Sequence, residues 1–225
     1  WSIPEPHIHD TVEDLIRAAN GRVIIATFAS QFRRMIAFMK AAESMGKKIA
    51  LEGRSIKTNL EIAKISGKFT PQDGSIISIN EIENYPVDQV LILCTGGQGE
   101  QFAALPRMAR GEHKSVKLNE RDTVILSSSV IPGNAGSVRK LKDNLSRHGL
   151  RIVQYRTSDI HASGHGNQDE LLWIQKTISP KFFMPVHGYH SMLRAHAQAV
   201  VERNNFPKEN IIIPDNGSII DVNDQ

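Results

Sequence analysis

Residues 22–28, Arg22-Val23-Ile24-Ile25-Ala26-Thr27-Phe28, form the run that decides the fold class. The run is apolar at nearly every position, as expected for a strand that is buried on both faces of a sheet. Ala29-Ser30 follows, and a helix is then expected over Gln31–Met45, with Gly46 ending it. A strand, a turn and a helix in this order favour a parallel sheet whose strands are connected by covering helices.

The same alternation of strand and helix continues to about residue 155. The expected strands are Ile49–Leu51, Ser75–Ile79, Gln89–Cys94, Asp122–Ser127 and Leu150–Tyr155, and the expected helices are Asp10–Ala19, Ser55–Ser66, Gln101–Arg110 and Gly136–His148. Asp10 or Thr11 is expected to cap the first helix. The fold class is therefore expected to be α/β, a mostly parallel sheet with helices on both faces. Ligands of such sheets bind at the carboxyl ends of the strands, where we expect the loops Thr27–Ser30, Leu51–Ser55, Thr95–Glu100 and Ser127–Asn134.

The character of the sequence changes after Tyr155, and a domain boundary is expected near residue 157. The loop His161–Gly166 is polar and contains two glycines and two histidines. The elements expected behind this loop are a helix over Asn167–Ile178, a strand over Phe182–Val186, a helix over His190–Asn204 and two short strands, Ile211–Ile213 and Ser218–Val222.

The composition is that of an ordinary globular protein. Of the 225 residues, 40% are hydrophobic and 23% are charged, and the net charge of +3 is compatible with a polyanionic partner. No apolar run reaches the roughly 18 residues of a membrane span, so we expect no membrane association. Cys94 lies in an apolar strand and is expected to be a buried, unreactive thiol, which fits the reducing cytoplasm. Because the chain begins with Trp1 rather than Met, we expect an excised or proteolytic piece of a longer protein.

Four of the nine histidines are expected to have ordinary surroundings. His113 and His148 stand among charged residues at expected helix ends, where an imidazole interacts favourably with the helix dipole. His7 and His9 have the spacing of a metal pair, but no further cluster of ligands lies near them, and Asp10 is better explained as a helix cap. We therefore expect no metal site at these four histidines.

Two other histidine loops are candidates for a functional site. Ser163, Gly164 and His165 lead into a helix, where backbone N–H groups can bind phosphate. The alternative is an ordinary glycine-containing turn with a solvent-facing histidine. His187 follows an expected strand and precedes Gly188, a frequent position for a metal ligand or a catalytic group, although one histidine is weak evidence. The local pattern leaves both alternatives open.

Several enzyme classes are not indicated by the sequence. Thr95–Glu100 is a glycine-rich turn between a strand and a helix, but its glycines do not have the dinucleotide-binding spacing. The chain has no phosphate-binding P-loop, and no Ser–His–Asp arrangement can be inferred from spacing. These observations disfavour an enzyme with a nucleotide cofactor or a protein nucleophile.

Six motifs, taken in order, resemble those of the ribonuclease J family. They are Thr27–Ser30 (TFAS), Gly53–Ser55 (GRS), Thr95–Glu100 (TGGQGE), Ser127–Asn134 (SSSVIPGN), His161–Gly166 (HASGHG) and Pro185–Gly188 (PVHG). In that family a β-CASP domain is inserted into a metallo-β-lactamase fold, and RNA lies in the cleft between them. The resemblance implies that residues 1–157 form the β-CASP domain. It also implies that residues 158–225 are an incomplete, returning part of the metallo-β-lactamase domain.

The resemblance further implies roles for individual residues. Ser30, Ser163, Gly164 and His165 match positions that bind RNA phosphate, including a 5′-monophosphate. His165 and His187 match catalytic motifs, and His187 matches a ligand of one of two zinc ions, which would generate hydroxide and hold the scissile phosphate. The implied protein is a cytoplasmic, zinc-dependent 5′–3′ exo- and endoribonuclease for RNA processing and decay. A homo-oligomer is compatible with this assignment.

The chain also departs from the family pattern. The His-x-His-x-Asp-His cluster that carries most metal ligands is absent, Gln31 and Arg33 replace Asn and His, and Tyr189 and Ala135 stand where Glu is usual. A single histidine, His187, does not hold zinc tightly, so we expect this chain alone to bind none and to be inactive.

Two alternative functions remain open. One is a non-catalytic module that lacks the zinc domain and holds RNA or a partner. The other is an unrelated α/β enzyme that acts on a small phosphorylated substrate. A metal-ligand cluster encoded upstream would favour the ribonuclease over the non-catalytic module. A preference for RNA ends over small phosphates would exclude the unrelated enzyme.

Overall fold

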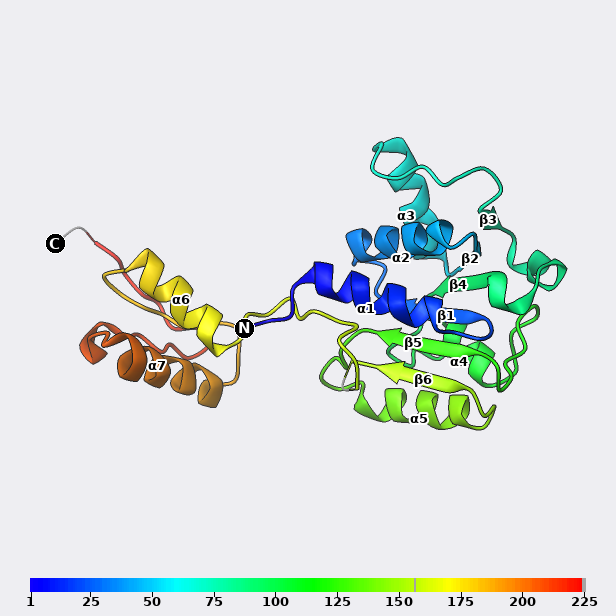
Figure 1. The fold of residues 1–225 in the computed structure, drawn as a ribbon. Coiled ribbons are helices and arrows are strands. Elements are labelled where there is room, and N and C mark those ends of the chain that lie inside the picture. Colours follow the sequence, from blue (N-terminus) through cyan, green and yellow to red (C-terminus); the bar gives the residue numbers. More distant parts are fainter. Residues whose placement is uncertain (156, 224–225) are drawn as a thin grey trace. The chain divides into compact units, whose positions relative to one another are not determined.

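The computed structural model describes residues 1–155 and 157–223, and it divides into two compact units (Figure 1). We call Ile3–Ala162 the sheet unit. The helical unit consists of Ser163–Gln225 together with Trp1–Ser2. The domain boundary expected near residue 157 lies shortly before this division.

The sheet unit contains a six-stranded sheet in which every pair of neighbouring strands is parallel, as the sequence predicted. The strands are β1 (Val23–Thr27), β2 (Lys48–Glu52), β3 (Ile76–Ile77), β4 (Val90–Cys94), β5 (Thr123–Ser127) and β6 (Arg151–Gln154). Their order across the sheet is β3-β2-β4-β1-β5-β6, so β1 lies between β4 and β5. The loops that follow these three central strands therefore leave the sheet side by side.

Helices cover both faces of the sheet (Figure 1). The helices α1 (Glu5–Arg17), α2 (Phe32–Ser44) and α3 (Arg54–Ile65) pack on one face, and α4 (Ala104–Ala109) and α5 (Ala135–Ser146) pack on the other. Successive side chains of a strand point to opposite faces, so Ile25 belongs to the core under α1–α3 and Ile24 to the core under α4 and α5. Because both faces are buried, β1, β4 and β5 are buried along their whole length.

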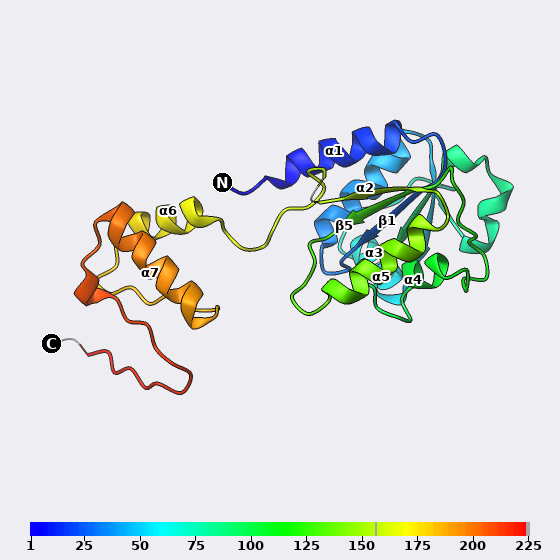
Figure 2. The same ribbon diagram turned by 90° about the horizontal axis from the view of Figure 1, so that it is seen from below.

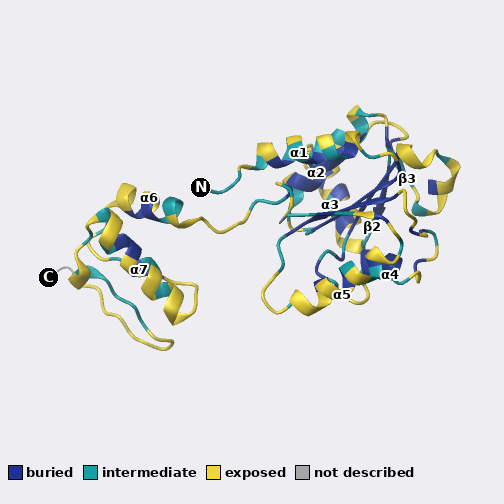
Figure 3. Ribbon diagram, turned by 60° about the horizontal axis from the view of Figure 1, so that its bottom comes forward, coloured by how far each residue is buried: buried dark blue, intermediate teal, exposed yellow. Residues whose placement is uncertain are grey.

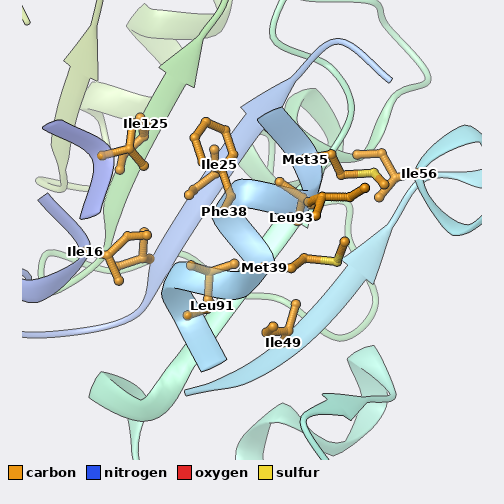
Figure 4. Packing of buried hydrophobic residues seen from close by; sticks show 14 of the residues in the cluster. Ile16, Ile25, Met35, Phe38, Met39, Ile49, Ile56, Leu91, Leu93 and Ile125 are labelled. Carbon is orange, nitrogen blue, oxygen red and sulfur yellow. The ribbon is translucent and has the colours of Figure 1, made fainter. Parts of the chain in front are cut away.

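The larger core lies between the sheet and α1–α3 (Figure 4). Phe38 and Met39 of α2 belong to this cluster together with Ile25 and Leu91 of the central strands, and all four are at most 1% exposed. Full burial of one such side chain contributes about 1.5–3 kcal/mol. The sheet unit is therefore held together by the apolar runs from which the sequence predicted its strands.

The helical unit has a much smaller core. Helices α6 (Gln168–Ile178) and α7 (His190–Asn204) pack against each other (Figure 2), and the buried hydrophobic cluster contains Leu172, Ala199 and Val200. Figure 3 shows α6 and α7 as largely exposed, in contrast to the buried strands of the sheet unit. In the described part of the chain, no helix is both long and apolar enough to cross a membrane.

The expected start of the first helix was wrong. Helix α1 begins at Glu5 with Pro4 at its N-cap, so Asp10 lies inside the helix and does not cap it. Pro6 is the second residue of the helix, and proline is tolerated in the first helical turn because the N–H that it lacks has no intrahelical partner there. The earlier start brings Ile8 into register with Val12 and Ile16, and all three are fully buried.

Three strands expected near the carboxyl end were also wrong. Phe182–Val186, Ile211–Ile213 and Ser218–Val222 form no strands in the structure, and the described residues there share one isolated bridge, between Phe183 and Ile211. A strand requires a neighbour that satisfies its backbone groups, and an apolar run alone does not supply one.

The remaining expected elements agree with the structure to within a few residues. The exceptions are β3, which is shorter than expected and is followed by a 3-10 helix over Ile79–Asn84, and α4, which begins at Ala104. Two further 3-10 helices span Val87–Gln89 and Lys208–Asn210.

Candidate functional site

Loops that follow the central strands meet at one edge of the sheet, as the sequence predicted. Ala26 of β1 pairs with Cys94 of β4, and Thr27 pairs with Ser127 of β5. Because these strands are parallel and in register, the loop containing Ser30 and the glycine loop Thr95–Glu100 leave the same edge. We call this the strand-end edge.

A pocket of about 300 Å³ lies at the strand-end edge. All four loops selected from the sequence contribute to its lining, which consists of Thr27, Phe28, Ala29, Ser55, Thr95, Gly96, Gly97, Glu100 and Ser128. Ser30 does not line this pocket, although its neighbour Ala29 does. The lining offers hydroxyl groups and one carboxylate, and no lysine or arginine. This chemistry suits a hydroxyl- or amide-bearing group such as a ribose or a base, because the Glu100 carboxylate would repel a phosphate.

The shape of this pocket depends on glycine. Gly96 has φ = 109°, and a Cβ atom at this position would lie 2.4 Å from Cδ of Pro106. Only glycine adopts this backbone conformation without strain and also leaves room for Pro106. At Gly97, a Cβ atom would lie 3.1 Å from Oγ of Ser128, so the loop passes close to the end of β5.

Gln98 organises the strand-end edge, and sequence reasoning did not select it. Its side chain is 3% exposed. Nε2 donates to Oγ of Ser128 at 3.1 Å and to the carbonyl oxygen of Ser129 at 2.8 Å, and Oε1 accepts from the N–H of Ile131 at 2.9 Å. These bonds join the loop after β4 to the loop after β5, across the end of β1. The feature of the sequence that could have pointed to Gln98 is an amide side chain within a run of glycines. An amide can both donate and accept hydrogen bonds, so it can connect two neighbouring loops.

The loop Ser163–His165 leads into α6, as the sequence predicted, but these residues do not form the first turn of the helix. Helix α6 begins at Gln168 behind Asn167, whose N–H donates to Glu170 at 2.7 Å in a capping box. Asparagine is a strong N-cap, and with glutamate three residues later it sets the helix start downstream of the loop. Within the loop, Oγ of Ser163 accepts from the N–H of His165 at 3.0 Å. Ser163, Gly164 and His165 are all exposed.

The structure brings the two candidate histidine loops together. The rings of His165 and His187 are stacked, with their centroids 5.5 Å apart and an interplanar angle of 11°. His187 has φ = 67°, an unusual backbone conformation for a residue other than glycine, and such conformations concentrate at functional sites. Two exposed imidazoles this close can bind one anion or supply nitrogen ligands and protons to a common group.

Zinc requires more ligands than this pair provides. Protein zinc sites use three or four side-chain ligands. Among the described residues, no group of three or more His, Cys, Asp and Glu side chains is arranged to hold a metal ion. The side chains that the structure describes therefore do not by themselves fit a zinc site.

The two histidines assigned to ordinary surroundings at helix ends have structural partners. His113 is buried, its Nδ1 accepts from the N–H of Val116 at 3.2 Å, and its Nε2 lies 3.5 Å from a carboxylate oxygen of Glu52. Nε2 of His148 lies 2.9 Å from the carbonyl oxygen of Ala109. Both side chains connect segments of the sheet unit.

Two family models match successive parts of the chain. The model described as "Ribonuclease J, beta-CASP domain" matches residues 20–145, which is more than half of the chain and includes most of the sheet unit. The model described as "Zn-dependent metallo-hydrolase RNA specificity domain" matches residues 152–214.

Curated relatives match nearly the whole chain. Ribonuclease J of Mycolicibacterium smegmatis is 41% identical over 218 residues, which cover 97% of this chain and 39% of the relative. Ribonuclease J 1 of Streptococcus pyogenes is 40% identical over 216 residues, covering 96% and 38%, and ribonuclease J of Mycoplasma genitalium is 35% identical over 226 residues, covering 100% and 40%. The chain thus spans about two fifths of the length of these relatives. The resemblance inferred from the six motifs is confirmed, and the chain belongs to the ribonuclease J family, with its β-CASP domain in the sheet unit.

Proposed function

We propose that this chain is the RNA-binding portion of a zinc-dependent ribonuclease J-like enzyme. The complete protein would be a 5′–3′ exo- and endoribonuclease that processes and degrades RNA in the cytoplasm. The observation that carries the proposal is the consecutive match of the two family models, with relatives named ribonuclease J matching along nearly the whole chain.

We propose residues 1–157 as the β-CASP domain and residues 158–225 as a returning part of a metallo-β-lactamase domain. Exposed apolar side chains of the helical unit support the second assignment. Large hydrophobic side chains that are 45–64% exposed include Trp173, Phe182, Met184, Val186 and Met192. So many exposed apolar side chains in a small unit mark a surface that packs against another protein segment. The rest of the metallo-β-lactamase domain is the proposed partner.

The proposed RNA contacts are Ser30, Ser163, Gly164 and His165. Hydroxyl groups, backbone N–H groups and an imidazole can all donate hydrogen bonds to phosphate oxygens, and a 5′-monophosphate end is the proposed ligand. His187 is proposed to contribute one nitrogen ligand to one of two zinc ions, and the stacked His165 lies where it can transfer a proton. When bound, the zinc ions would supply an activated hydroxide.

Because the described residues contain no zinc-binding cluster, we expect this chain alone to bind little zinc. After dialysis, elemental analysis should find far less than one zinc ion per chain, and the chain should not cleave RNA. Near-equimolar zinc would contradict the proposal, because it would require a ligand set that differs from the family's.

The division of labour between the two loops is testable in the complete protein. Ser163→Ala should weaken the preference for 5′-monophosphate over 5′-hydroxyl RNA about tenfold, because one charge-assisted hydrogen bond is lost. His187→Ala should abolish cleavage and leave end binding largely intact. Ser218→Ala, an exposed serine elsewhere in the helical unit, is the matched control. Equal loss of end binding in the Ser163 and His187 variants would show that the roles are assigned wrongly. RNA binding without cleavage by the complete wild-type protein would support the non-catalytic module instead.

A further inference from the structure

Arg34 of α2 is a buried cation whose partners lie at the two ends of the sheet unit. Its side chain is 1% exposed, less than any other charged side chain among the described residues. Nε donates to a carboxylate oxygen of Glu5 at 3.1 Å, and Nη2 donates to the other oxygen of the same carboxylate. Nη1 lies 2.8 Å from Nδ1 of His161, and Nη2 donates to the carbonyl oxygen of Ala162 at 3.5 Å.

These partners mark where the chain enters and leaves the sheet unit. Glu5 is the first residue of α1, close to Ile3 where the unit begins, and Ala162 is its last residue. Another contact joins the same two segments, because Nε2 of His7 lies 3.1 Å from a carboxylate oxygen of Asp159. A single guanidinium group therefore bonds to both ends of the sheet unit. Its contact with Glu5 is a bidentate, charge-assisted hydrogen bond, which is stronger than a bond between neutral groups.

The contact with Arg34 also determines the protonation state and the tautomer of His161. A guanidinium group can only donate hydrogen bonds, so Nδ1 of His161 must accept, and the imidazole is neutral with its proton on Nε2. The backbone of Ser127, at the end of β5, also interacts with this imidazole. Burial and the charge of Arg34 lower the pKa of His161, and Glu5 and the Ser127 backbone oppose them in part.

The segment before His161 is anchored as well. Ile160 is fully buried, and Oγ of Ser127 donates to its carbonyl oxygen at 2.7 Å. The chain is thus held through Ala162, and the next residue is Ser163. Ser163, Gly164 and His165 are all exposed, so apart from the stacking of His165 on His187 little packing fixes where they lie.

We propose that Arg34 is a positioning residue for the phosphate-binding loop. By holding Glu5, His161 and Ala162 together, it fixes the point from which Ser163–His165 leave the sheet unit. This inference rests on the proposed function, in which that loop binds the 5′-monophosphate end of RNA. Arg34 itself touches no substrate in this account and acts through His161 and Ala162.

The test uses the complete protein and the ratio of the Kd for 5′-hydroxyl RNA to the Kd for 5′-monophosphate RNA. This ratio does not depend on the fraction of molecules that are folded, so a purely stabilising role of Arg34 would not change it. Arg34→Met keeps most of the side-chain length and removes every donor. It should lower the ratio about tenfold and change the Kd for 5′-hydroxyl RNA little. Lys40→Met is the matched control, because Lys40 is exposed on the same helix and loses the same charge.

A second pair of variants decides the question if Arg34→Met does not fold. In His161→Asn the amide oxygen can stand in for Nδ1 and accept from Arg34, so the ratio should be retained. His161→Leu offers no acceptor and should lower the ratio as Arg34→Met does.

Two results would overturn the inference. One is an unchanged ratio in Arg34→Met or His161→Leu, even with a lower melting temperature, because Arg34 would then only stabilise the fold. The other is a wild-type protein that does not distinguish the two RNAs, which would refute the phosphate-loop assignment and the inference with it. In the first case the wild type still distinguishes the RNAs, so the two failures can be told apart.

Discussion

Replacing Gln98 with leucine tests whether this one side chain holds the loops of the strand-end edge together. Leucine is similar in size and cannot form hydrogen bonds. The substitution removes the bonds from Gln98 to Ser128, Ser129 and Ile131, which measure 3.1, 2.8 and 2.9 Å. Because Gln98 is 3% exposed, water does not readily replace the lost partner.

The size of the effect follows from these three bonds. Each contributes about 1 kcal/mol, so the free energy of unfolding of the sheet unit should fall by about 3 kcal/mol. With a denaturant dependence of about 2 kcal/mol per molar urea, the unfolding midpoint should fall by about 1.5 M.

Two optical signals separate the units in this experiment. The far-ultraviolet circular dichroism signal reports mainly on the larger sheet unit. Both tryptophans, Trp1 and Trp173, belong to the helical unit, so tryptophan fluorescence reports on that unit and should change little. Gln101→Leu, an exposed glutamine in the neighbouring turn, is the matched control and should stay within about 0.5 kcal/mol of wild type. A loss below about 1 kcal/mol in Gln98→Leu would refute the reasoning.

Three further predictions concern buried and partly buried groups of the sheet unit. Arg22→Met should cost about 3–5 kcal/mol in urea unfolding, because it leaves the 2%-exposed Asp122 without its two-pronged partner at 2.8 and 3.1 Å. Adding Asp122→Leu should restore much of the loss, and no recovery would contradict this account. Burial raises the pKa of the Cys94 thiol, so a maleimide should label it only after unfolding, and rapid labelling of the native protein would contradict its burial. Burial and Arg34 lower the pKa of His161, so the unfolded chain binds the proton first, and stability should fall as pH drops below about 6.5. Urea unfolding at pH 7 and pH 5.5 should show a smaller loss of stability on acidification in His161→Asn than in wild type. An identical loss in the two proteins would contradict the assignment to His161.

The strands and the order of elements in the sheet unit were predictable because their signals are local. A run such as Val23–Thr27 is apolar at almost every position, and only a strand covered on both faces buries all of it. The glycine loop Thr95–Glu100 was likewise recognisable, and its position at the strand-end edge follows from parallel strands alone. The failures occurred where a local signal needed a distant partner. Phe182–Val186 reads as a strand, yet an apolar run becomes one only beside a neighbour that completes its hydrogen bonds.

The candidate site was predictable residue by residue but not as an arrangement. His165 and His187 were each selected from their own loops, whereas the stacking of their rings depends on how α6 and α7 pack. Gln98 and Arg34 were not selected at all. Arg34 lies 127 residues from His161, and nothing in the sequence near either residue indicates the other. The periodicity of helices and the apolar runs of buried strands are visible within short stretches of the chain, so the sequence by itself indicated them. Buried hydrogen-bond networks join residues that only the path of the whole chain brings together, so the tertiary structure alone decided them.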